Sequence, residues 1–218
     1  MGSSPLIQLL VLAGIAVFLI LRLRNVLGTR DGFEPPREVA TTQRRGPDLE
    51  VIEGGPDRDI TDHVEEGSDS AVALGKMKSA EPGFGVSDFL GGAKGAYEMI
   101  LMGFEKGDLA PIKDFLAEDV YETFEQVVKA REEQGLTIEA EFIGVRETTL
   151  QEATFDDATR EAEVTVKFIG ELTYVVRNAE GEVVEGSETQ IKRQKDAWTF
   201  ARVMGADDPN WQLVATGE

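Results

Sequence analysis

Tyrosine and carboxylate side chains are the groups in this chain that could carry out proton transfer. The sequence has no cysteine, so thiolate nucleophiles, disulfides and thiolate metal sites are excluded. Its single histidine, His63, falls in a polar stretch and is interpreted as a solvated linker residue. A buried aspartate with a raised pKa beside Tyr97, Tyr121 or Tyr174 could isomerise or dehydrate an apolar substrate.

The positions of the acidic residues do not favour such catalysis. Asp108, Asp156, Asp157 and Asp196 are expected at turns and on solvent-facing surfaces. Tyr174 alternates with the apolar residues of a predicted strand, which favours a packed aromatic side chain. We therefore predict no catalytic residue, no metal site and no cofactor, and a protein that is not an enzyme.

The long apolar run at residues 6–23 predicts a membrane anchor. As a helix its 18 residues would reach roughly 27 Å, about the thickness of a hydrocarbon core. Arg22, Arg24 and Arg30 mark its C-terminal side, whereas residues 1–5 carry no charged side chain. The positive-inside rule then predicts a single-pass protein with its N-terminus outside and the rest in the cytoplasm. A cleaved signal peptide, the alternative, would place basic residues before the run.

Composition divides the chain into an anchor at residues 1–28, a linker at 29–80 and a domain at 81–218. The linker is predicted to be disordered because prolines, glycines and charges replace any hydrophobic period. As a flexible coil of about 50 residues it would span roughly 40 Å. Residues 81–218 carry 29 acids and 13 bases, and this charge disfavours nucleic acid as a partner.

Helical periodicity begins the predicted domain. Apolar residues recur at spacings of three and four from Phe89 to Phe104, with Ser87 as the expected N-cap and Gly107 as the stop. A short helix at 109–116, with Asp108 as its N-cap, and a longer one at 118–134 are expected to follow.

After residue 135 the period changes from helical to alternating. The clearest strand covers residues 161–176, where Gly170 is expected to mark a bend or bulge. A less regular strand at 137–153 precedes it, and strands at 183–193 and 198–204 follow a hairpin turn. The prediction is an α+β domain with helices on the concave side of a curved, four-stranded antiparallel sheet.

The concave interior of such a sheet would be apolar. Its candidate lining residues are Tyr97, Leu101, Phe104, Phe142, Val166, Phe168, Trp198 and Phe200. They could line a pocket for a lipid tail or another small apolar ligand. Alternatively they fill an ordinary core, since protein interiors are normally close-packed. An exposed apolar cleft would instead favour a ligand or a polypeptide client.

Five short motifs follow one another in a characteristic order. They are GGAKGAY at 91–97, GDL at 107–109, DVYETF at 119–124, DAWTF at 196–200 and DPNWQL at 208–213. In this order they resemble the Tim44-like domain family, within the superfold of cystatin-like and nuclear-transport-factor-2-like proteins. The apolar run followed by LRNVLGTR at 23–30 is similar to bacterial members that carry their own membrane helix.

The resemblance implies a membrane-anchored adaptor of the bacterial inner membrane. The mitochondrial relative tethers an Hsp70-type chaperone and incoming polypeptide to a translocation channel. A role in protein translocation or membrane-protein biogenesis, through polypeptide or chaperone partners, is therefore expected. This chain departs from that relative in having no counterpart of the long charged N-terminal segment that engages the chaperone. A binding module for a lipid or small apolar ligand is the second hypothesis, and an isomerase or dehydratase the third.

Overall fold

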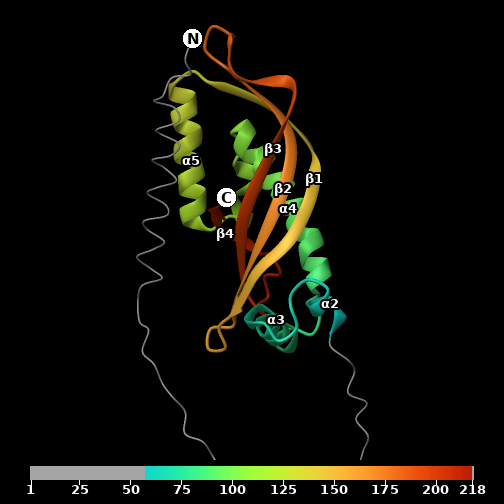
Figure 1. Cartoon of the computed structure of the whole chain (residues 1–218). Coiled ribbons are helices and arrows are strands. Elements are labelled where there is room, and N and C mark those ends of the chain that lie inside the picture. Colours follow the sequence, from blue (N-terminus) through green and yellow to red (C-terminus); the bar gives the residue numbers. More distant parts are fainter. Residues whose placement is uncertain (1–56, 218) are drawn as a thin grey trace, which may run out of the picture. The chain divides into compact units, whose positions relative to one another are not determined.

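Helical segments precede four antiparallel strands in residues 57–217, the part of the chain that the computed structural model describes (Figure 1). The helical segments are α2 (Arg58–Thr61), α3 (Asp69–Ala80), α4 (Val86–Lys106), the 3₁₀ helix η1 (Ala110–Phe115) and α5 (Glu118–Glu133). The strands are β1 (Thr137–Phe155), β2 (Glu161–Arg177), β3 (Val183–Val203) and β4 (Gln212–Gly217). The predicted α+β class with a curved four-stranded antiparallel sheet is confirmed.

The predicted anchor at residues 1–28, with Arg22, Arg24 and Arg30, lies outside the described residues. Within residues 57–217, no helix combines the length and the apolar character that crossing a bilayer requires.

The sheet has the order β1-β2-β3-β4, so β2 and β3 are its inner strands. Along β2, Ala162, Val164, Val166 and Phe168 are fully buried and alternate with polar or solvent-facing residues. This alternation is the predicted one, and it directs one face of the strand into the core. Figure 1 shows the long strands curving, with α4 and α5 on the concave side.

Two strands predicted separately, at 183–193 and 198–204, are one continuous strand, β3. The charged residues between them stay in the ladder, with Lys195 opposite Ile169 and Asp196 opposite Phe168. Their polar side chains predicted a turn. A strand with one solvent-facing surface can include polar residues without interruption, however. The fourth strand is β4, which pairs with β3 from Ala197 to Ala201.

Gly170 on β2 lies directly against the Tyr97 side chain of α4. A Cβ atom at this position would sit 2.7 Å from the Tyr97 hydroxyl oxygen, so only glycine leaves room for the ring. The irregularity expected here occurs on the neighbouring strand, where the register of β1 shifts on either side of Val145, the partner of Gly170.

Helix α4 begins at Val86, earlier than predicted, and Ser87 is not its cap. The N-cap residue Gly85 has no side chain to donate or accept. Instead, the carboxylate of Asp59 on α2 accepts hydrogen bonds from the backbone N–H groups of Val86 and Ser87, at 2.8 and 2.9 Å. The cap is therefore supplied from another element. At the other end Gly107 adopts a left-handed conformation with φ of 70°, as a C-terminal glycine stop requires.

The segment after Gly107 differs from the prediction in its type of helix. It is the 3₁₀ helix η1, flanked by Leu109 rather than capped by Asp108, with no side-chain capping bond. The next helix, α5, begins where predicted and ends one residue earlier, at Glu133, and Gly135 follows with φ of 66°.

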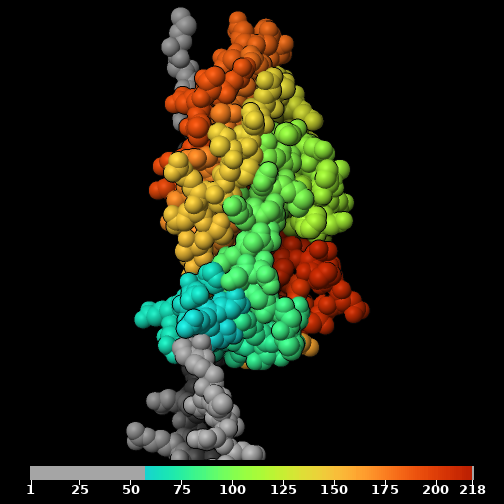
Figure 2. All heavy atoms as spheres, turned by 90° about the vertical axis from the view of Figure 1, so that its right-hand side faces the viewer, coloured from blue at the N-terminus to red at the C-terminus, as the bar shows by residue number. Residues whose placement is uncertain are grey.

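The predicted linker at 29–80 is wrong for its C-terminal part, which forms α2 and α3. Ser68 caps α3, and Leu74 and Met77 of this helix have no exposed surface. The Ser70 hydroxyl accepts a hydrogen bond from the backbone N–H of Ala153 on β1. Figure 2 shows these helices packed with the first part of α4. The domain therefore begins before residue 81, while residues 29–56 lie outside the described residues.

Candidate functional site

The eight residues predicted to line a pocket do come together. Six of them are buried members of the main core cluster: Tyr97, Leu101, Val166, Phe168, Trp198 and Phe200. Phe104 and Phe142 are partly buried and pack against that cluster. Tyr97 stacks on Phe168 with ring centroids 4.5 Å apart and an interplanar angle of 18°, and the Trp198 ring lies 4.7 Å away.

These contacts have the geometry of a close-packed core. Tyr97 and Phe168 have no exposed surface, and Trp198 and Phe200 are buried to within a few per cent. Edge-to-face contacts continue from Phe168 to Trp198 and Phe200, a preferred aromatic arrangement. The side chains thus pack against one another on the concave side of the sheet.

A carboxylate enters this core from β3. The Tyr97 hydroxyl donates a hydrogen bond of 2.5 Å to Asp196, whose other oxygen accepts from the Gln194 amide at 3.0 Å. Burial, and then the Asp196 carboxylate, raise the pKa of Tyr97 well above its usual range. Asp196, expected at a solvent-facing turn, is therefore a half-buried hydrogen-bond partner of the buried Tyr97. Because Tyr97 is wholly enclosed and bonded to β3, this pair fixes α4 on the sheet.

A second polar contact joins the end of α4 to α5. The Arg131 guanidinium lies 3.8 Å from the Glu105 carboxylate and 4.4 Å from the centre of the Phe104 ring. It also donates a hydrogen bond to the Phe104 carbonyl. Burial raises the pKa of Glu105, and the charges of Arg131 and Lys192 act in the opposite direction.

The same polar region continues onto β2 and β3. The Tyr174 hydroxyl donates to Glu185 at 2.5 Å, and the Lys192 ammonium lies 4.5 Å from the centre of the Tyr174 ring. Burial and the Glu185 carboxylate raise the pKa of Tyr174 to about 12. Sequence analysis missed this region because its members come from separate elements and have no common spacing.

A groove of about 520 Å³ opens between η1, the first turns of α5 and β4. Its lining residues are Lys113, Asp114, Leu116, Glu118, Tyr121, Glu122, Glu125 and Gln212. The Tyr121 ring is partly exposed, and the Lys113 ammonium lies 5.1 Å from its centre. The groove therefore combines an aromatic surface with a largely acidic border.

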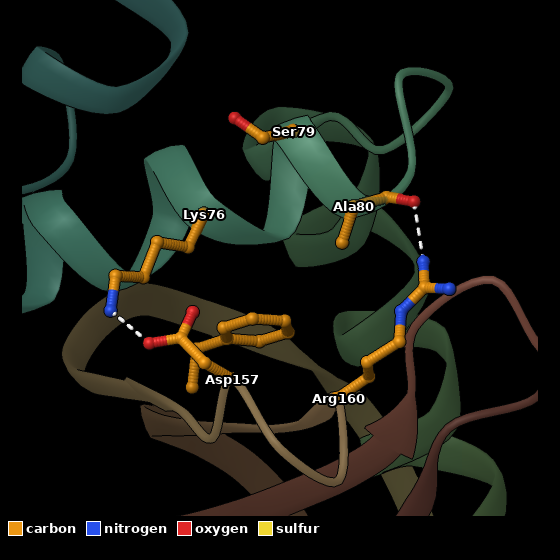
Figure 3. Close-up of a pocket in the computed structure, with 6 residues that line it drawn as sticks. Lys76, Ser79, Ala80, Asp157 and Arg160 are labelled. Atoms are coloured by element: carbon orange, nitrogen blue, oxygen red, sulfur yellow. Dashed lines mark hydrogen bonds and ion pairs between the residues drawn. The ribbon is translucent and has the colours of Figure 1, made fainter.

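A smaller hollow of about 300 Å³ lies between α3 and the turn that joins β1 to β2 (Figure 3). Its two cations already have partners. The Lys76 ammonium pairs with the Asp157 carboxylate at 2.5 Å, and the Arg160 guanidinium donates to the Ala80 carbonyl at 2.7 Å. Figure 3 shows both side chains reaching across between the helix and the turn. We interpret this hollow as part of the contact that holds α3 against the β1–β2 turn.

The described residues do not form an evident metal site. Between residues 57 and 217, no group of three or more histidine and carboxylate side chains could hold a metal ion. That the protein works without a cofactor remains a prediction.

Comparisons with known proteins point to one family. The family model of the Tim44-like domain matches residues 70–218, a range that begins inside α3. The mitochondrial import inner membrane translocase subunit TIM44-1 of Arabidopsis thaliana is 22% identical over 162 residues, which cover 72% of this chain and 34% of that protein. This chain thus matches about a third of the length of its curated relative.

A solved structure gives only a weak match. The crystal structure of the intermembrane space region of the chloroplast protein ARC6 aligns with a TM-score of 0.39 and 8% identity, covering 60% of this chain and 92% of that one. Similarity at this level carries no argument about fold or function.

Proposed function

Since this chain belongs to the Tim44-like domain family, we propose that it is a non-enzymatic adaptor that assists protein translocation or membrane-protein biogenesis. The observation that carries the proposal is the family match over residues 70–218, which includes most of α3 and every later element. The name of the Arabidopsis relative, a translocase subunit of a mitochondrial inner membrane, supplies the process. Partners would be translocating polypeptides, a chaperone or the translocation machinery.

The proposal includes attachment to a bacterial inner membrane. Residues 6–23 would span the bilayer once, and Arg22, Arg24 and Arg30 would keep the following residues in the cytoplasm. Residues 29–56 would then connect the anchor to the folded unit. This topology supports the adaptor proposal, because it would hold a binding surface close to a membrane channel.

We propose the groove beside α5 as the polypeptide-binding surface. Glu118, Glu122 and Glu125 are spaced so that they lie along one face of α5, and all three line the groove. They would attract cationic segments of a client, while the Tyr121 ring would contact apolar side chains. A mixed surface of this kind accepts many sequences, which an adaptor for diverse clients needs.

Site-specific crosslinking tests the proposal. A photoreactive amino acid would replace Glu122 in the groove or, as a matched control, Thr149, an exposed residue on β1 at the opposite edge of the sheet. Inverted inner-membrane vesicles containing either variant would receive a radiolabelled precursor arrested during translocation. The expected result is a labelled product from the Glu122 position that disappears when the precursor is released. Equal labelling from both positions, or none from either, contradicts the proposal.

A further inference from the structure

Strand β1 forms one edge of the sheet, and its first six residues are the regular part of that edge. Residues 137–142 pair with β2 without a shift of register, whereas the rest of β1 is interrupted at Ile143, Arg146 and Gln151. Bulges of this kind bend an edge strand and hinder the approach of another strand. Since residues 137–142 contain none, they keep the regular spacing of backbone groups that strand addition requires.

The outer edge of this regular segment is also uncovered. Within residues 57–217, its backbone groups form no hydrogen bond outside the ladder that joins β1 to β2. The other end of β1 differs, because the N–H of Ala153 donates to the Ser70 hydroxyl of α3. Figure 1 shows β1 at the margin of the sheet. Residues 137–142 therefore present backbone N–H and C=O groups that can pair with another strand.

The two faces of the segment differ in chemistry. Phe142 lies on the concave side of the sheet, where its ring centroid is 6.2 Å from that of Tyr97. By alternation the other even-numbered residues of the segment share that side, and all of them are half-buried. Glu139 and Glu141 project from the opposite face and are exposed. A strand added beside β1 would therefore meet apolar side chains on one face and carboxylates on the other.

We propose that residues 137–142 bind an extended segment of another polypeptide as a fifth strand, and that the bound segment alternates basic and apolar residues. Its lysine or arginine side chains would pair with Glu139 and Glu141, and its apolar side chains would cover the concave side. A second copy of β1 is the poorer occupant, because registers centred on this segment oppose Glu139 to itself or to Glu141. Backbone hydrogen bonds would supply the affinity, and the alternating side chains the sequence preference.

A synthetic peptide tests the proposal on the full chain in detergent micelles. The probe is Thr-Lys-Val-Lys-Val-Lys-Thr, with a fluorophore at its N-terminus and photo-leucine in place of one valine. A control peptide has the same composition with its lysines in one block and its valines in another, so it keeps the charge and loses the alternation. Fluorescence anisotropy is expected to show binding of the alternating peptide that is about fivefold tighter or more. Mass spectrometry is expected to locate its photoproduct in residues 137–142.

Charge reversal at two matched positions tests the role of the carboxylates. Glu141 and Glu152 are both exposed on β1 and both lie near a threonine of β2, but Glu152 adjoins the end of the strand that α3 covers. Glu141→Lys replaces an attraction by a repulsion and is expected to weaken binding of the alternating peptide by about fivefold. Glu152→Lys is expected to change it by less than about twofold. We change Glu141 because Glu139 already lies 3.4 Å from the Arg177 guanidinium.

Four results overturn the proposal. The two peptides could bind equally well, the photoproducts could lie only outside residues 137–142, or Glu141→Lys and Glu152→Lys could have equal effects. Peptide binding could also fall as the protein concentration rises, which would show that a second copy occupies the edge. The proposal is independent of the groove beside α5, so Glu122→Lys is expected to leave the photoproduct in residues 137–142 unchanged. Thr149, the control position for the groove, lies in the interrupted part of β1.

Discussion

Replacing Gly170 by alanine tests how α4 is seated on the sheet. The added Cβ would lie 2.7 Å from the Tyr97 hydroxyl oxygen and 3.0 Å from Cε1 of the same ring. Tyr97 cannot move away easily, because its ring is stacked on Phe168 and its hydroxyl is bonded to Asp196. The variant must therefore shift a buried ring, a helix or a strand.

The size of the effect follows from two opposing contributions. Overpacking of this kind costs about 1–3 kcal/mol. Replacing a glycine in a strand lowers the entropy of the unfolded chain, which stabilises the folded state by about 0.4–1 kcal/mol. We expect Gly170→Ala to lower the free energy of unfolding by about 1–2 kcal/mol. Gly144→Ala on the neighbouring strand is the matched control, since its Cβ would have no atom within 4 Å. It is expected to be neutral or slightly stabilising.

Urea unfolding of residues 54–218, which form a compact unit, provides the assay. With a slope of roughly 2 kcal/mol per molar urea, the midpoints of Gly170→Ala and Gly144→Ala differ by roughly 1 M. Tyr97→Phe removes the oxygen of the closest contact, so the cost of Gly170→Ala is smaller in that background. If Gly170→Ala and Gly144→Ala unfold at the same urea concentration, the close approach of the ring to the strand is refuted.

Three further predictions concern the elements that precede α4 and the contacts that fix them. Leu74→Ala, at a position with no exposed surface, is expected to cost about 2–5 kcal/mol in urea unfolding, whereas Val72→Ala, 53% exposed on the same helix, stays within about 0.5 kcal/mol. Equal effects would contradict a buried face of α3. Glu81→Gln removes the carboxylate that pairs with the nearly buried Arg202 guanidinium and costs about 1–3 kcal/mol, seen as a lower thermal midpoint. Burial opposes ionisation of Asp59, but its hydrogen bonds from Lys78 and the start of α4 hold its pKa well below the usual range. This depressed pKa gives stability that is present above about pH 4 and lost as the pH falls further, so Asp59→Asn flattens the acid limb of a stability–pH curve.

The sequence predicts best the elements that have one buried and one solvent-facing surface. β2 alternates buried and solvent-facing residues from Glu161 to Leu172, and α4 places Phe89, Tyr97 and Leu101 on one buried face. In both cases a single period directs apolar side chains to one core, so pattern and packing agree. Gly107 and Gly135 adopt the left-handed conformations that helix ends favour, and the sequence places both correctly.

The sequence predicts poorly the elements that only tertiary packing stabilises. α3 has Gly75 at its centre and apolar residues on several faces, so its period is weak. Its burial comes from β1, including the bond between Ser70 and Ala153, and no local pattern reports that contact. Asp196 is a similar case. A charged residue just before an aromatic strand predicts a turn. Asp196 lies within β3 instead, where it accepts a hydrogen bond from Tyr97, 99 positions away in the sequence.

The filled interior bears on where this family member can bind partners. Within residues 57–217 the aromatic side chains of α4, β2 and β3 occupy the concave side of the sheet, and Tyr97 is tied to both inner strands by Phe168 and Asp196. Opening that interior would separate stacked rings and break the hydrogen bond between Tyr97 and Asp196, at a cost of several kcal/mol. The groove beside α5 needs no such rearrangement. An adaptor that meets many partners is therefore better served by this outer surface than by the core, and crosslinking from Glu122 tests it directly.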